Sequence, residues 1–307
     1  MNGKVGDSWQ WDARLVQAKW NFSAPGGTDT PRFDRFWMTN KNLLGGTVEM
    51  GKMMLYPGKG AFYGNTGDTE GLFYTTKLNK LSMRLGTGRA SSQDVRFAEA
   101  TYRPTKTMDF GAYVLKHDAG AGILKVGDVS FGPYSGKDLD LQVINGAFEI
   151  PGTGGLAMSF EYAKNKSNDI TTQTIPVKLM KGNQSGYFVA IQSKYAATNY
   201  MPALYTSMVN PFKQGDHGWA LSYRHMPSGV AGMANRGGFS WVPLTTDKDG
   251  TLQNNYNGVN AWRFDYIYVP WKNVQWTFSY DRSTPIDKAA LGNWTNNSLQ
   301  STFNFFF

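Results

Sequence analysis

The sequence predicts an all-β protein that crosses a membrane as an antiparallel β-barrel. Three observations lead to this fold class: apolar and polar residues alternate along much of the chain, short turns alternate with long polar loops, and no apolar run reaches the length of a membrane helix. A helix needs about 20 apolar residues to cross a bilayer. A barrel strand needs about ten, and every second one faces a wet interior. The mean hydropathy of −0.43 agrees with such half-polar strands.

Strict alternation marks strands that have one apolar and one polar face. In residues 156–162, for example, Met158, Phe160 and Tyr162 alternate with Ser159 and Glu161. About fourteen strands are expected on this basis: 8–22, 32–43, 47–57, 70–78, 81–90, 94–103, 108–118, 138–149, 155–165, 183–198, 216–225, 258–269, 273–282 and 295–307. Residues 94–118 and 138–149 are mixed on both faces, which we attribute to a subunit interface.

The lengths of the connections separate a membrane barrel from a soluble β-sandwich, in which strands alternate equally well. Tight turns are expected at 44–47, 79–80, 104–107, 151–154 and 270–273. Longer polar segments are expected at 23–31, 57–70, 119–137, 166–182, 226–257 and 283–294. Short periplasmic turns and long extracellular loops are typical of outer-membrane barrels. Residues 198–215 fit this scheme poorly and require a long periplasmic connection or a distortion.

Aromatic residues near strand ends indicate interfacial girdles, although strands favour aromatic residues in any case. They include Trp9, Trp11, Trp20, Phe22, Trp37, Tyr56, Tyr268, Trp271, Trp276 and Tyr280. The last strand places Phe303, Phe305 and Phe307 on one face, and it resembles the signal that barrel-assembly machinery reads.

The first residues contain no apolar core of a signal peptide. We therefore interpret residues 1–307 as a single barrel domain whose export signal lies outside this chain. Residues 2–5, followed by a Gly-Asp-Ser turn, are expected to form the tail of an earlier strand.

Composition argues against several other functions. The chain has no cysteine for a disulfide, a thiolate metal site or a nucleophile. Its net charge of +8 is spread singly along the strands, so nucleic-acid binding is not expected. Ser222 and His225 would point to opposite faces of a strand, and His117 and His217 stand in no metal-binding spacing. We expect no enzyme activity, no cofactor and no metal.

Two segments carry a family resemblance. Residues 45–55, followed after a Gly-rich loop by Gly71-Leu72-Phe73-Tyr74, resemble the barrel region of general bacterial porins. The similarity is greatest to OmpM-type porins of diderm Firmicutes, which carry an S-layer-homology domain and a coiled-coil stalk before the barrel. The resemblance implies a 16-stranded barrel, a homotrimer, an outer-membrane location and a link to peptidoglycan through a domain absent here.

The chain departs from that pattern in lacking the S-layer-homology domain and stalk, and in showing fourteen strands. If one full strand and most of another precede residue 2, residues 57–70 become the third extracellular loop. In general porins this loop folds into the lumen and narrows it.

The expected function is passive diffusion of small polar solutes and ions through a water-filled pore surrounded by outer-membrane lipid and lipopolysaccharide. Charged residues on the polar strand faces and in the constriction loop would select solutes. The wall residues are Asp12, Arg14, Arg84, Glu161, Arg224, Arg263, Asp265 and Asp281, and the loop residues are Lys59, Asp68 and Glu70. Wall arginines facing loop carboxylates would create a transverse field, and the excess of Lys and Arg favours anions.

Three alternatives stay open. The barrel could serve as an envelope tether or adhesin with a plugged lumen, which conductance would distinguish. A sugar-specific channel would need an aromatic ladder along the lumen. A soluble all-β carbohydrate-binding protein would remain dispersed without detergent.

Overall fold

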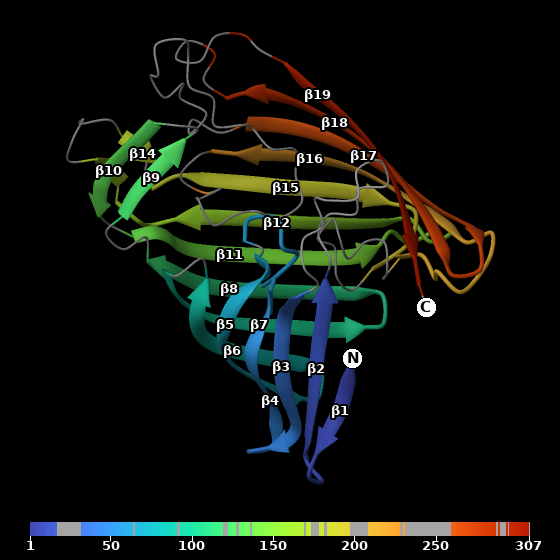
Figure 1. The fold of residues 1–307 in the computed structure, drawn as a ribbon. Helices are drawn as coiled ribbons and strands as arrows, with labels where there is room; N and C mark the ends of the chain where they lie inside the picture. The colour runs from blue at the N-terminus through green and yellow to red at the C-terminus, as the bar shows by residue number, and fades with distance from the viewer. Residues whose placement is uncertain are drawn as a thin grey trace, which may run out of the picture.

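The computed structural model is dominated by one antiparallel sheet of fifteen strands (Figure 1). It describes the chain except residues 17–31, 64, 91–92, 119–121, 127–128, 136, 169, 173–177, 181–182, 197–207, 228–229, 231–258, 287, 289–292, 294 and 307. The sheet is strongly curved, since β2 to β4 run at a steep angle to β8 through β15. No helix within the described ranges is long and apolar enough to span a bilayer.

Each strand of this sheet pairs with its neighbours in chain order, apart from two excursions into a smaller sheet. The strands are β1 (Asn2–Val5), β2 (Trp9–Val16), β3 (Arg32–Leu43), β4 (Gly46–Leu55), β5 (Asn65–Leu78), β6 (Leu81–Ala90), β7 (Gln93–Thr105), β8 (Met108–Asp118), β11 (Lys137–Glu149), β12 (Ala157–Asn165), β15 (Ser185–Gln192), β16 (His217–Met226), β17 (Val259–Trp271), β18 (Val274–Pro285) and β19 (Asn296–Phe305).

The fourteen predicted strands correspond to β2 through β19 of this sheet, and the predicted tail at residues 2–5 is β1. β1 pairs with β2 from Asn2 opposite Asp12 to Val5 opposite Trp9. In the described part of the chain, β1 and β19 are the two edges of the sheet. The predicted extension of the first strand to residue 22 lies outside the described residues.

Two predicted loops contain further strands that alternation did not reveal. A four-stranded sheet in the order β14-β13-β10-β9 consists of β9 (Gly122–Val126), β10 (Val129–Ser135), β13 (Ile170–Thr172) and β14 (Lys178–Met180). It lies beside the ends of β8, β11 and β12 (Figure 1). These segments therefore pair with one another as a second sheet at the long-loop end.

The tight turns occur where they were predicted, all at the opposite, short-turn end. Leu44 and Gly45 join β3 to β4 with φ of 54° and 73°, and Asn79 and Asn273 also have positive φ. Consecutive positive φ angles give the type I′ geometry that suits the twist of a two-residue hairpin. The Tyr74 hydroxyl donates to the Leu44 carbonyl at 2.8 Å and holds the first turn.

Alternation separates an inner from an outer face. On β12, Glu161 is 1% exposed whereas the adjacent Tyr162 is 43% exposed. On β18, the inner positions are Gln275, Thr277, Ser279, Asp281 and Ser283, all buried. Three of the six outer positions of the same strand are aromatic, namely Trp276, Phe278 and Tyr280.

Phe303 and Phe305 of the last strand are 52% and 61% exposed on the outer face. Trp37 is an exception to the girdle prediction, because it packs against the apolar cluster inside the barrel. Trp20, Phe22 and Phe307 lie outside the described residues.

The poorly fitting segment 198–215 belongs to a long connection between β15 and β16 at the short-turn end. Its described residues Ala196, Met208 and Val209 are buried against inward-facing Ala220, Ile267 and Val269. The described residues of the connection therefore pack against the inner face of the wall. A long connection at this end, the first of the two expected explanations, is confirmed by the bounds of β15 and β16.

Candidate functional site in the barrel lumen

Residues 56–63, which connect β4 to β5, fold into the barrel and are called the lumen loop below. Ala61, Phe62 and Tyr63 are at most 1% exposed, although they belong to a connection at the long-loop end. Gly58 and Gly60 adopt φ of 60° and 68°, which lets the backbone reverse inside the barrel. A Cβ on Gly58 would lie 2.7 Å from Tyr113 and 2.8 Å from Glu161.

Backbone amides of the lumen loop are held by carboxylates of the barrel wall. Gly58 donates to Glu99 Oε1 at 2.7 Å. Lys59 donates to Glu161 Oε2 at 2.6 Å, and Phe62 donates to Glu161 Oε1 at 3.3 Å. The Tyr113 hydroxyl also donates to Glu161 Oε1, at 3.2 Å. Glu161 is therefore a loop anchor, and its buried carboxylate does not face open solvent.

Asp109, at the start of β8, joins two separate connections. The Lys59 ammonium donates to Asp109 Oδ1, and the pair is buried. The Tyr195 hydroxyl, from the β15–β16 connection, donates to Asp109 Oδ2 at 2.6 Å. Burial, and then the hydrogen bond and charge of Asp109, raise the pKa of the Tyr195 phenol above its ordinary value. One carboxylate thus ties the lumen loop to the short-turn end.

Arg224 on β16 supports the lumen loop from another wall strand. Its Nη1 donates to the Ala61 carbonyl at 3.4 Å. Its guanidinium carbon lies 5.2 Å from the centroid of the Phe188 ring. The side chain is 1% exposed, so the structure places this predicted wall residue beneath the loop.

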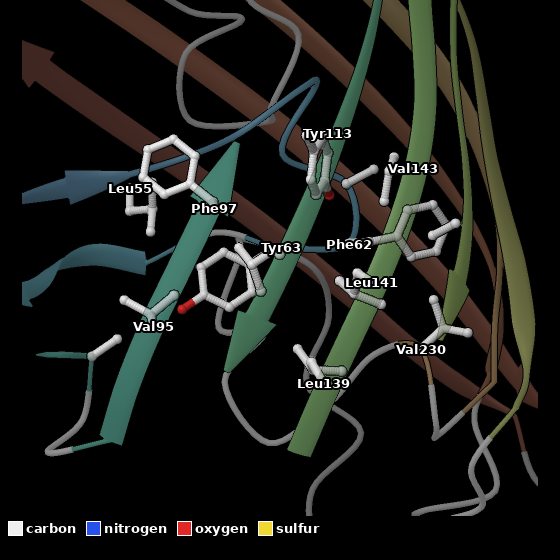
Figure 2. Close-up of a cluster of buried hydrophobic side chains, with 14 of the residues drawn as sticks. Leu55, Phe62, Tyr63, Val95, Phe97, Tyr113, Leu139, Leu141, Val143 and Val230 are labelled. Carbon is white, nitrogen blue, oxygen red and sulfur yellow. The ribbon is translucent and has the colours of Figure 1, made fainter. Parts of the chain in front are cut away.

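Apolar packing under the lumen loop was not predicted. Figure 2 shows Phe62 and Tyr63 of the loop among inward-pointing side chains of the wall. The wall residues include Val95, Phe97, Leu115, Leu139, Leu141 and Val143 of β7, β8 and β11. These are the strands that are mixed on both faces. The mixing was attributed to a subunit interface, but the lumen loop that covers their inner face accounts for the inward apolar residues.

A second charged cluster lies further round the sheet, on β17 and β18. Arg263 donates to both Asp265 oxygens at 2.8–3.0 Å and to Asp281 Oδ2 at 3.3 Å. Ser279 accepts from Arg263 at 3.0 Å and donates to Asp265 at 2.6 Å. Two carboxylates surround one guanidinium, so this inner-wall cluster carries one net negative charge.

Arg84, Asp12 and Arg14 lie at inner positions, as predicted. The Arg84 guanidinium carbon lies 4.9 Å from the centroid of Phe73, an inner residue of β5. Asp12 stands opposite inward-facing Trp37. Arg14, opposite Arg35, is exposed.

The structure agrees only in part with the prediction that Lys59, Asp68 and Glu70 lie in the constriction loop. Glu70 is exposed on the outer face of β5, opposite Lys52 and beside outward Leu72, so it does not belong to the lumen loop. The prediction began β5 at residue 70, whereas this strand begins at Asn65. The side chain of Asp68 lies outside the described residues. Lys59 does lie in the loop, where Asp109 neutralises it.

Solved structures with the same architecture are outer-membrane channels and porins. OccK5 of Pseudomonas aeruginosa is 12% identical with a TM-score of 0.55, covering 97% of this chain and 76% of that one. OmpT, an outer membrane protein of Vibrio cholerae, is 10% identical with a TM-score of 0.53, covering 99% and 87%. The outer membrane channel DcaP of Acinetobacter baumannii is 13% identical with a TM-score of 0.51, covering 100% and 83%.

No protein-family model matches the chain, and no curated protein matches it in sequence. At these identities the likeness shows the fold alone. The chain has the fold of an outer-membrane β-barrel and not that of a soluble β-sandwich. Solved structures that share this fold include a porin and an outer membrane channel, and in this chain residues 56–63 fold into the lumen.

Proposed function

We propose that this protein is an outer-membrane porin, which lets small hydrophilic solutes and ions diffuse passively through a water-filled pore. The observation that carries the proposal is the one-sided attachment of the lumen loop. Its anchors belong to β7, β8, β12 and β16, whereas inner positions of β2 and β19, such as Arg14 and Gln300, are exposed. The passage therefore runs between the loop and the wall of β19 and β2.

The polarity of that wall suits water and ions. Inner positions of β19 carry Asn, Ser, Gln and Thr side chains that are partly or fully exposed, and these offer hydrogen bonds to passing solutes. Phe62, Tyr63 and Phe73 are 0% exposed under the loop, and Trp37 packs against the same apolar cluster. Among the residues that the structure describes, the inward aromatic rings therefore present no ladder to a sugar. This arrangement favours general diffusion over a sugar-specific channel.

The charges suggest mild anion preference. Lys59 and Glu161 take part in the contacts that hold the lumen loop. The Arg263 cluster carries one net negative charge. Arg14 is an exposed inner cation, and Arg84 lies opposite Glu99 across β6 and β7. We infer the preference from the excess of Lys and Arg over the whole chain, whose net charge is +8.

The assembly is proposed to be a homotrimer of single-domain barrels, as in OmpM-type porins. One solved OmpT of Vibrio cholerae is described as a trimer form, at 10% identity and a TM-score of 0.52. We further propose that outer-membrane lipid surrounds the trimer and that any link to peptidoglycan runs through a domain outside these residues. Size-exclusion chromatography with light scattering in detergent measures the subunit number directly.

Single-cysteine variants test the pore, because the chain has no cysteine of its own. Gln300 and Leu299 are adjacent on β19, and their partners Ser279 and Tyr280 point inward and outward. We expect a charged, membrane-impermeant thiol reagent to reduce single-channel conductance of Gln300→Cys in planar bilayers. The matched Leu299→Cys should keep its conductance.

Two outcomes would overturn the proposal. The first is refolded protein that inserts into bilayers, as shown by protease protection, yet gives no conductance steps; the barrel would then be a plugged tether. The second is equal inhibition of both cysteine variants, which would show that current does not follow the inner face. Reversal potentials in asymmetric KCl, with cation selectivity as the contrary result, test the anion preference.

A further inference from the structure

The outer wall of the barrel is hollowed over β6 to β12. The groove has a volume of about 630 Å³, within the range of roughly 300–1,000 Å³ common for small-molecule sites. Most of its lining side chains point away from the lumen, because they alternate with buried inward residues. These outward residues are Met83, Leu85, Ala98, Ala100, Ala112, Val114, Gln142, Ile144, Tyr162 and Lys164. We call it the outer groove.

Alanine residues form the floor of the outer groove. Ala100 lies opposite Ala112 across β7 and β8. Larger side chains rise on either side, since Leu85 on β6 and Ile144 on β11 are 52% and 56% exposed. A strip of methyl groups between taller apolar walls makes a channel along the strands, open to the bilayer.

Basic residues crowd the long-loop end of the same outer face. The outer basic rim consists of Arg89, Arg96, Lys116, Lys164 and Lys166, all exposed. Arg89 is paired with Asp94 at 3.5 Å and Lys116 with Asp140 at 3.6 Å. Among the residues the structure describes, no carboxylate lies within ion-pair distance of Arg96, Lys164 or Lys166.

The rim and the groove floor are separated by about one leaflet. Ala112 and Lys116 are four residues apart on β8, which corresponds to about 13 Å at 3.3 Å per residue. The apolar band of an outer-membrane barrel is about 25 Å tall. If the alanine floor lies near mid-height, the rim reaches the level of the outer headgroups.

We propose that the outer groove binds a phosphorylated lipid of the outer leaflet, with an acyl chain on the alanine floor and its phosphate against the outer basic rim. Apolar lining suits the chain, and the three cations without ion pairs suit a phosphate group. The inference rests on the membrane fold and does not depend on permeation.

Native mass spectrometry of the full chain refolded in detergent tests the proposal, with dimyristoyl phosphatidic acid as the probe. Dimyristoyl phosphatidylcholine, which has the same chains and a zwitterionic headgroup, is the control lipid. Ala100→Trp fills the groove floor, and the double variant R96Q/K164Q removes two rim charges. Leu221→Trp and Arg282→Gln, on the outer faces of β16 and β18, are matched controls.

We expect the apparent dissociation constant for phosphatidic acid to rise about tenfold in Ala100→Trp and in R96Q/K164Q. The two control variants should bind phosphatidic acid as the original chain does, and phosphatidylcholine should bind more weakly to all. Heat-modifiable migration in gels confirms that each variant has folded.

Unchanged binding in both groove and rim variants would overturn the proposal, as would equal binding of the two lipids. A loss of oligomers in Ala100→Trp with unchanged lipid binding would also overturn it, because the groove would then seat a second copy. Channel conductance is unaffected by these outcomes, so failure here is distinct from failure of the porin function.

Discussion

The backbone amide of Lys59 donates a 2.6 Å hydrogen bond to the carboxylate of Glu161, a residue 102 positions later in the chain. This contact joins the lumen loop to the middle of β12. The same carboxylate also accepts from Phe62 and Tyr113, so one side chain fixes both the start and the end of the buried turn. The position of the lumen loop is therefore fixed in part by a wall residue outside the loop.

Replacing Glu161 by alanine should release the lumen loop and widen the pore. Three hydrogen bonds are lost, worth on the order of 3 kcal/mol at about 1 kcal/mol each. We expect higher single-channel conductance and passage of larger polyethylene glycols. Ser159→Ala, two residues away on the same inner face and equally buried, should leave both measurements unchanged. A Glu161→Ala channel with the original size limit would show that the other contacts of the loop, with Glu99, Asp109, Arg224 and the apolar cluster, hold it without Glu161.

Asp109→Ala should destabilise the barrel more than the loss of a single hydrogen bond. It leaves the Lys59 ammonium buried without its partner, which costs about 3–5 kcal/mol. Tyr195→Phe removes only the other hydrogen bond to Asp109 and should cost about 2 kcal/mol. Urea unfolding from lipid vesicles, followed by tryptophan fluorescence, gives both free energies.

The double variant Lys59→Met with Asp109→Leu separates the charge effect from packing. It removes both members of the buried pair, so stability should recover relative to Asp109→Ala. Equal instability of the single and double variants would mean that shape, and not the unpaired ammonium, dominates at this position.

Arg263 should control ion selectivity through the two carboxylates that surround it. Arg263→Gln leaves Asp265 and Asp281 uncompensated, so reversal potentials in asymmetric KCl should shift toward cation preference. Asp281→Asn should shift them the other way. Arg282→Gln makes the same charge change on the outer face of β18 and should have no effect. Equal shifts from Arg282→Gln and Arg263→Gln would point to surface charge rather than the lumen.

Local alternation of apolar and polar residues predicted most of the strands of the fold. Period-two alternation on β12 and β18 is imposed by the bilayer on one side and by the lumen on the other, so it is readable from neighbouring residues. On β7 and β8 the inner face is apolar at Val95, Phe97 and Leu115, because the lumen loop covers it. There alternation weakens, and only the family resemblance indicated that a loop lies inside.

The candidate site was harder to predict than the strands, because its contacts join parts of the chain that are distant in sequence. Gly58 and Glu99 are 41 residues apart, and Ala61 and Arg224 are 163 apart. Inner facing was predicted for Glu161 and Arg224 from alternation. Their role in holding the loop depends on its path across the barrel, which no local pattern specifies.

Asp216, which precedes β16 at the short-turn end, should make the free energy of unfolding depend on pH in the acid range. Burial alone would raise its pKa, but hydrogen bonds from Lys194 at 2.6 Å and from the amides of Asn210 and His217 outweigh burial and lower the pKa. A lowered folded-state pKa means that the ionised group stabilises the fold above its unfolded value of about 3.9. This contribution to stability is lost as the pH falls from the unfolded-state pKa through the lowered folded-state pKa.

Asp216→Asn should therefore be less stable than the original chain at pH 7, by about 1–2 kcal/mol. The difference should close as the pH is lowered below both pKa values. Urea unfolding curves measured between neutral pH and acid follow this convergence. Asp94→Asn is the control, because Asp94 and its partner Arg89 are both largely exposed and the bridge is screened by water. If the difference in the free energy of unfolding between Asp216→Asn and the original chain did not change with pH, lost packing and not the lost charge would be its cause.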